Sequence, residues 1–193
     1  YAYMKHFALN DQEGNRNCMV ATWSNEQAIR EIYLKPFEMS VKDADCHAVM
    51  SSFNYIGNRW AGGCSELLQN VLRGEWGFLG FVETDYFGVY GYMTADQAVR
   101  NGGDLMLCTT GNDYNNVTVL TNSSKQAMRT AAKNILYTVV NSRAYEAENL
   151  NPGMAKWKII LIGADVVVAL LIVGLEYTAI KNYKKRKEEE EEV

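Results

Sequence analysis

Polar side chains that could take part in chemistry follow directly after apolar, strand-like runs of the sequence. Three such positions are Asp85 after residues 80–84, Asn10 to Arg16 after residues 3–9, and Asn54 after residues 48–53. A carboxylate such as Asp85 can act as a nucleophile, or as a general acid or base. If the runs are parallel strands of a barrel, their carboxyl ends lie at one rim and these side chains converge there.

The elements that must position these residues alternate between strands and helices. Runs that favour strands occupy residues 3–9, 48–53, 80–84 and 104–108. Each run precedes a stretch with helical periodicity. A hydroxyl followed three residues later by Gln predicts helix starts at Ser24, Thr94 and Ser123. This βαβα order predicts an α/β fold with a parallel sheet covered by helices.

Two architectures fit this order of elements. A small doubly wound sheet would bind a cofactor at a glycine-rich turn after a strand, but Gly102 and Gly103 precede a strand instead. The alternative is the later half of a (β/α)8 barrel of the TIM type, with about four βα units, since a closed barrel needs about 250 residues. The polar rim favours the half barrel.

Composition narrows the classes of partner. The chain has 193 residues, of which 48% are hydrophobic and 22% charged, and a net charge of −4, so we expect a globular core and no nucleic-acid partner. The four cysteines, Cys18, Cys46, Cys64 and Cys108, lack CxxC spacing, so no metal site is expected.

An apolar run at residues 159–175 predicts a single transmembrane helix. Asp165 within it costs roughly 2.5–3.5 kcal/mol, which the 12 Ile, Leu and Val residues of the run outweigh at about −0.3 to −0.6 kcal/mol each. Five basic residues follow the run between 181 and 187, and Lys156 and Lys158 precede it. We therefore expect a single-pass membrane protein with an extracytoplasmic soluble part and a cytoplasmic C-terminus.

Longer motifs follow one another along the first 145 residues. They read KHFALNDQEGNR, SNEQAIREIYLKPFE, AVMSSFN, LLQNVLRGEWGFLGFVETD and NGGDLML. In this order they resemble the catalytic barrel of glycoside hydrolase family 3, the β-glucosidase-like enzymes. We therefore expect a partial glycoside hydrolase barrel over residues 1–145, a linker over 146–156, a transmembrane helix over 157–180 and a charged cytoplasmic tail over 181–193.

The resemblance implies roles for single residues. The family's aspartate nucleophile matches Asp85, its Lys-His pair that holds substrate hydroxyls matches Lys5 and His6, and its aromatic in the leaving-group subsite matches Tyr86. A Lys5 side chain near Asp85 would help to keep it ionised. Phe53 stands where the family often has a tyrosine, and KHFALND lacks the histidine of the glucosaminidase branch, so that branch is not expected.

The acid/base residue of the family has no counterpart in this chain. In the β-glucosidase branch the acid/base comes from a sandwich domain. The spacing of Glu13, Glu83 and Asp104 gives no reason to assign this role to any of them. We expect that sandwich and the early strands before Tyr1, or in another chain, so that the sequence is a fragment and inactive alone.

The implied function is a retaining β-glycosidase that acts on a β-linked oligosaccharide or glucoside, forms a covalent glycosyl-aspartate and uses no cofactor. The alternative is a non-catalytic, membrane-anchored sugar-binding or scaffold protein derived from the same fold.

Overall fold

The computed structural model describes residues 1–87, 90–109, 115–146, 150 and 153–191, with side chains through residue 187. Within it the chain forms two compact units, Tyr1–Tyr145 and Glu146–Val193.

A parallel sheet is the centre of the first unit. Its strands are β1 (Met4–Phe7), β3 (Ala48–Ser51) and β6 (Phe81–Glu83), in the order β1-β3-β6. All pairs are parallel, with Met4 opposite Val49 and Val49 opposite Val82. Three of the expected strands are therefore confirmed, and their carboxyl ends lie at one edge.

The expected fourth strand at residues 104–108 is reduced to a parallel bridge between Glu83 and Leu105. The backbone N–H of Leu107 donates to the Thr84 hydroxyl at 3.1 Å, so a side chain takes the place of a ladder carbonyl. The prediction of a full strand here was wrong, although the segment still lies beside β6.

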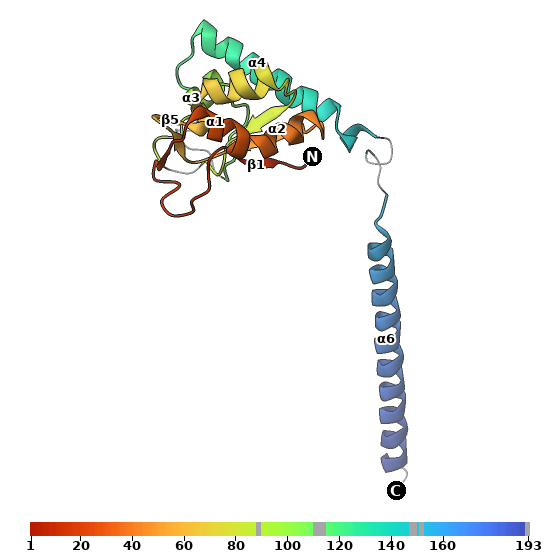
Figure 1. The fold of residues 1–193 in the computed structure, drawn as a ribbon. Coiled ribbons are helices and arrows are strands. Elements are labelled where there is room, and N and C mark those ends of the chain that lie inside the picture. Colours follow the sequence, from red (N-terminus) through yellow and green to blue (C-terminus); the bar gives the residue numbers. More distant parts are fainter. Residues whose placement is uncertain (88–89, 110–114, 147–149, 151–152, 192–193) are drawn as a thin grey trace. The chain divides into compact units, whose positions relative to one another are not determined.

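Helices follow each strand, as the βαβα order predicts (Figure 1). After β1 come α1 (Glu26–Ala28), the π-helical η1 (Ile29–Tyr33) and α2 (Lys35–Lys42). The π-helical η3 (Glu66–Glu75) follows β3, α3 (Ala95–Arg100) follows β6, and α4 (Asn122–Val140) follows the bridge segment. The remaining short elements are β2 (Ala21–Thr22), β4 (Tyr55–Ile56), β5 (Arg59–Trp60), η2 (Ala61–Gly63) and η5 (Arg143–Tyr145), of which β2, β4 and β5 form a second small sheet.

Helix starts agree with the sequence at one position of three. The Thr94 hydroxyl accepts from Gln97 N at 3.3 Å, as expected. The other two predictions were wrong by one or two residues, because Asn25 accepts from Ala28 N at 2.8 Å and Thr121 forms a reciprocal cap with Ser124. Asn and Thr cap as well as Ser, so the local pattern left the choice open.

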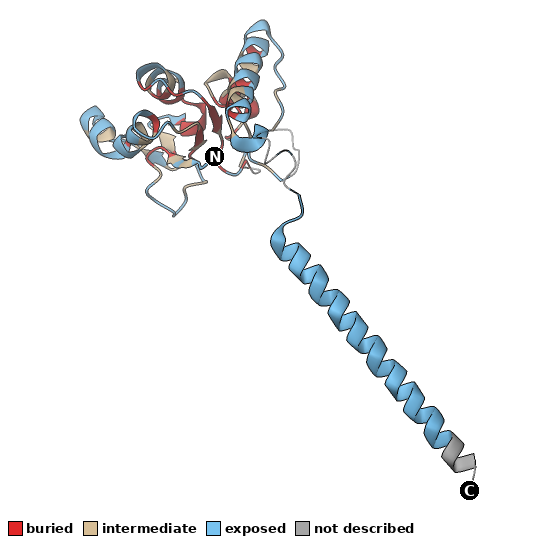
Figure 2. Ribbon diagram, turned by 90° about the vertical axis from the view of Figure 1, so that its right-hand side faces the viewer, coloured by how far each residue is buried: buried red, intermediate tan, exposed pale blue. Residues whose placement is uncertain are grey.

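The main core lies between the sheet and its helices, where the residues coloured as buried concentrate in Figure 2. Phe7 on β1 is fully buried, and its ring centroid lies 5.1 Å from that of Phe37 and 5.8 Å from that of Trp76. A second cluster is formed by Phe53, Trp60, Phe87, Met93 and Ala98. It includes Phe53 and Phe87, which lie beyond the carboxyl ends of β3 and β6. The cluster therefore packs at the same end of the sheet as the polar rim.

The second unit contains one long helix, α6 (Lys156–Glu191). Among the described residues it is the one helix long and apolar enough to cross a membrane, by length and composition. Its side chains are exposed from residue 156 to 187 (Figure 2). The charged segment expected as a separate tail continues this helix to Glu191.

Candidate functional site

Asp85 lies immediately beyond β6, at the carboxyl edge of the sheet, and is 7% exposed. Its carboxylate accepts a hydrogen bond from the backbone N–H of Tyr86 through Oδ1 at 2.8 Å. Oδ2 lies 3.2 Å from Arg16 Nη1 and 3.4 Å from His6 Nε2. The structure therefore brings Asp85 and His6, two residues that the resemblance singles out, into contact.

His6 lies on β1. Its protonation is affected by its burial and by the charged groups around it. Burial lowers the pKa of His6, while Asp85 opposes this and Lys5 and Arg16 add to it. The imidazole is therefore neutral near pH 7, and Arg16 carries the positive charge against the Asp85 carboxylate.

Arg16 belongs to the polar run after the first strand, but the sequence assigned it no role in the site. Besides Asp85 it binds the exposed Glu13 through Nε at 2.9 Å, and its guanidinium lies 4.9 Å from the centroid of the Phe53 ring. Phe53, which lacks a tyrosine hydroxyl, thus supplies an aromatic face for a cation. The signal available was the polar run after the first strand, but nothing local tied Arg16 to a residue 69 positions away.

The loop that carries Arg16 has an unusual backbone. Leu9, Asn15 and Met19 all have positive φ near 60°. Such conformations cost about 1 kcal/mol or more for residues other than glycine, and persist where surrounding contacts impose them. Asn15 and Met19 flank Arg16 in the sequence.

Lys5 does not take the place expected for it next to the nucleophile. The side chain is exposed, and within the described residues the basic side chains in contact with Asp85 are the neutral His6 and the charged Arg16. Its charge acts on His6 instead. A contact between Lys5 and a substrate hydroxyl stays a prediction.

Tyr86 and Asn54 lie near the same edge but differ in accessibility. Tyr86 is 43% exposed, and its hydroxyl lies 3.1 Å from that of Thr109. Asn54 is fully buried, and its amide donates to Ala8 O at 3.1 Å and to Thr22 Oγ1 at 3.0 Å. Tyr86 can therefore meet a ligand, whereas Asn54 joins the loops after β1 and β3.

Three tyrosines surround Phe53. Tyr92 donates to Phe53 O at 3.1 Å, and its ring contacts those of Tyr55 and Tyr90. Burial raises the pKa of Tyr92, with the nearby tyrosines adding to the rise, so its hydroxyl stays protonated as a donor. This cluster fixes the Phe53 ring against which Arg16 packs.

The other carboxylates near the strands have partners of their own. Asp104 binds Arg73 at 2.7 Å, and Glu13 binds Arg16. Burial raises the pKa of Glu83, while a hydrogen bond with Tyr3 opposes the rise. None of the three is thereby identified as a second catalytic carboxyl group. Across the described part of the chain, no three His, Cys, Asp or Glu side chains gather as a metal site would require.

Known proteins share this sequence and fold. Residues 1–136 match the family described as Glycosyl hydrolase family 3 N terminal domain. The chain is 44% identical over 104 residues to Beta-glucosidase B of Emericella nidulans, covering 54% of this chain and 12% of that protein. It is 40% identical over 102 residues to Probable beta-glucosidase K of the same organism, covering 53% of this chain and 12% of that protein.

Solved structures agree with these matches. β-Glucosidase 3B from Thermotoga neapolitana, in complex with glucose, superposes with a TM-score of 0.62 at 30% identity, over 76% of this chain and 22% of that one. The β-glucosidase from Kluyveromyces marxianus gives a TM-score of 0.60 at 29% identity, over 72% of this chain and 17% of that one. The chain thus spans less than a quarter of each of these relatives.

Proposed function

Because the chain belongs to glycosyl hydrolase family 3, whose N-terminal domain matches residues 1–136, we propose that it supplies the nucleophile half of a retaining β-glycosidase. The substrate is a β-glucoside or a β-linked oligosaccharide. The observation that carries this proposal is the buried Asp85 carboxylate at the end of β6, held by Arg16, His6 and the Tyr86 N–H.

The proposed reaction has two displacements at the anomeric carbon. Asp85 attacks this carbon and forms a glycosyl-aspartate, while a second carboxyl group gives its proton to the leaving oxygen. That group, then a carboxylate, removes a proton from water, and the resulting attack releases the sugar and restores Asp85.

The residues around Asp85 prepare the first step. The Tyr86 N–H and the Arg16 guanidinium hold the carboxylate in one orientation, which favours attack in line with the leaving group. In this proposal, substrate hydroxyls contact the neutral His6 and the exposed Lys5. The leaving group contacts Tyr86.

The acid/base and the remaining barrel strands come, in this proposal, from polypeptide outside these 193 residues. Support comes from the small share of each relative that the chain spans and from the engagement of Glu13 and Asp104. The isolated chain is then expected to be inactive, and measurable turnover by it would contradict this part of the proposal.

The nucleophile is tested in the complete protein that contains this chain. Hydrolysis of an aryl β-glucoside is compared between the unaltered protein, Asp85→Asn and the control Asp43→Asn. The control changes an exposed aspartate at the C-terminal end of α2. We expect loss of turnover in Asp85→Asn alone. Equal rates in all three would overturn the assignment of Asp85.

We also propose that α6 anchors the protein in a membrane, with residues 1–145 outside the cytoplasm. Length and composition support the span, and the basic residues 181–187 support the orientation. Extraction of cell membranes at alkaline pH tests the anchor, and release of the protein without detergent would contradict it. Protease added to intact cells tests the orientation, because only an external unit is digested.

The scaffold alternative rests on three departures from the family: Phe53 stands where a tyrosine is often found, Tyr86 stands where the aromatic after the nucleophile is commonly a tryptophan, and the chain lacks a counterpart of the acid/base residue. It predicts that the complete protein binds oligosaccharides without hydrolysing them. Binding that is retained with no turnover, in a preparation shown to be folded, would favour the scaffold over the enzyme.

A further inference from the structure

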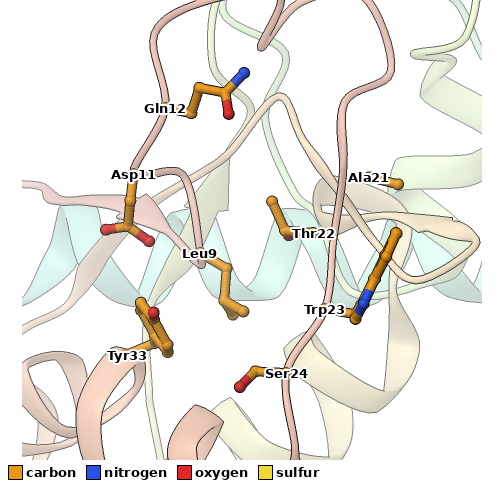
Figure 3. Close-up of a pocket in the computed structure, with 8 residues that line it drawn as sticks. All are labelled: Leu9, Asp11, Gln12, Ala21, Thr22, Trp23, Ser24 and Tyr33. Carbon is orange, nitrogen blue, oxygen red and sulfur yellow. The ribbon is translucent and has the colours of Figure 1, made fainter.

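A hollow lies beside the loop that carries Arg16 (Figure 3). Its volume is about 460 Å³, within the range of roughly 300–1,000 Å³ that is typical of small-molecule pockets. The lining residues are Leu9, Asp11, Gln12, Ala21, Thr22, Trp23, Ser24 and Tyr33. In Figure 3, Asp11 and Trp23 stand on opposite sides, with Leu9 and Thr22 between them.

The walls of this hollow combine aromatic faces with uncommitted polar groups. Trp23 is 77% exposed and Tyr33 is 37% exposed, so both rings are accessible. Within the described contacts the Asp11 carboxylate has neither an ion pair nor a hydrogen bond, and Gln12 uses only its amide nitrogen, which donates to Gly14 O at 2.7 Å. Acceptors therefore remain available opposite an indole ring.

These groups select a class of ligand. No Lys, Arg or His lines the hollow, so it does not favour phosphates or other anions. A carboxylate in the wall disfavours a fully apolar ligand. A neutral sugar unit fits both conditions, because its C–H face packs on an aromatic ring and its hydroxyls donate to a carboxylate.

The hollow is tied to the surroundings of Asp85 by one loop and one hydrogen-bond network. Arg16 lies between Gln12 and Ala21 in the sequence and binds Asp85. Thr22 donates to Tyr55 O at 2.8 Å and accepts from Asn54, whose amide also donates to Ala8 O. A ligand in the hollow would therefore contact the same loop whose Arg16 binds the Asp85 nucleophile.

We propose that this hollow is a secondary saccharide subsite, which binds a sugar unit of the oligosaccharide away from the bond that is cleaved. The proposal rests on the proposed function, since that function supplies the oligosaccharide. Trp23 is the stacking platform and Asp11 accepts hydrogen bonds from hydroxyls.

The test uses the complete protein and two substrates, an aryl β-glucoside with one sugar unit and a β-linked gluco-oligosaccharide of five units. The measured quantity is the ratio of kcat/KM for the oligosaccharide to kcat/KM for the aryl glucoside. We expect Trp23→Ala to lower this ratio about tenfold and Asp11→Asn to lower it a few-fold. The control Tyr145→Ala, which removes another aromatic side chain, 59% exposed, is expected to leave the ratio unchanged.

An unchanged ratio in both Trp23→Ala and Asp11→Asn would overturn the subsite. Failure of the proposed function looks different, because the unaltered protein would then hydrolyse neither substrate. In that case calorimetric titration with the oligosaccharide decides. Binding that Trp23→Ala weakens about tenfold and Tyr145→Ala does not would keep the subsite, and equal binding in all three proteins would reject it.

Discussion

Two aspartates lie close to β6, Asp85 beyond its carboxyl end and Asp104 beside Val82, and they are nearly equally buried but have different partners. Asp85 is 7% exposed and Asp104 is 8% exposed. Each pairs with an arginine and accepts a backbone N–H, from Tyr86 for Asp85 and from Val82 for Asp104. Burial and pairing alone therefore do not identify a functional carboxylate.

The difference lies in what the partners do. Arg73 reaches Asp104 from η3, and Asn134 reaches it from α4 at 2.9 Å, so Asp104 joins two helices to the sheet. Burial raises the pKa of Asp104 to about 6, against the opposing effect of Arg73 and the hydrogen bonds. Asp85 instead has partners from the loop and strand at the rim, beside the exposed Lys5 and Tyr86. We infer that Asp104 is structural and that Asp85 is available for chemistry.

The largest effect is expected when the Asp85 charge is removed. This change should lower activity but not stability. In the complete protein, Asp85→Asn should lower kcat by roughly a thousandfold or more, as loss of a catalytic nucleophile does. Steady-state kinetics and thermal unfolding measured on the same sample check this. A large fall in melting temperature together with retained activity would reverse the roles of the two aspartates.

Removal of the Asp104 side chain should affect stability instead. Asp104→Ala leaves Arg73 buried without its carboxylate, which should lower the free energy of unfolding by about 3–5 kcal/mol. Urea unfolding measures this, with Asp43→Ala, an exposed aspartate at the C-terminal end of α2, as a milder comparison. A loss below about 1 kcal/mol would contradict a structural role for Asp104.

Substitution of Arg16 tests the role of the cation that pairs with Asp85. Arg16→Gln removes the charge opposite Asp85 and should reduce kcat/KM roughly 10- to 100-fold, the range for a hydrogen bond to a charged group. The matched variant Arg59→Gln changes an exposed arginine on β5 and should have no comparable effect. Equal kinetics for both variants would remove Arg16 from the site.

The smallest expected effect is the pH dependence that His6 causes. Its pKa is lowered in the folded protein, so below the ordinary value of 6.5 the unfolded state binds a proton that the folded state does not. The contribution of His6 to stability is therefore present above about pH 6.5 and is lost as the pH falls below it. Urea unfolding at pH 7.5 and 5.5 should show a smaller loss of stability in His6→Asn than in the unaltered protein, and an equal loss would contradict this.

Sequence patterns predicted much of the fold because the relevant signals are local. Apolar runs of β-favouring residues predicted β1, β3 and β6, and the hydroxyl-Gln spacing predicted the start of α3. The position of Asp85 directly after a strand predicted its place at the carboxyl edge of the sheet. The apolar run predicted a long helix, because its composition alone distinguishes it.

Only the tertiary structure decided which distant groups meet. Arg16 reaches Asp85 across 69 positions, and Asp104 meets Asn134 across 30. Neither pairing follows from local spacing, because one depends on the path of the loop after β1 and the other on the packing of α4 against the sheet. The sequence by itself determined the order of the elements and the strand-end aspartate. Packing decided that Arg16, and not Lys5, pairs with Asp85, and that Asp104 is enclosed while Asp85 stays at the rim.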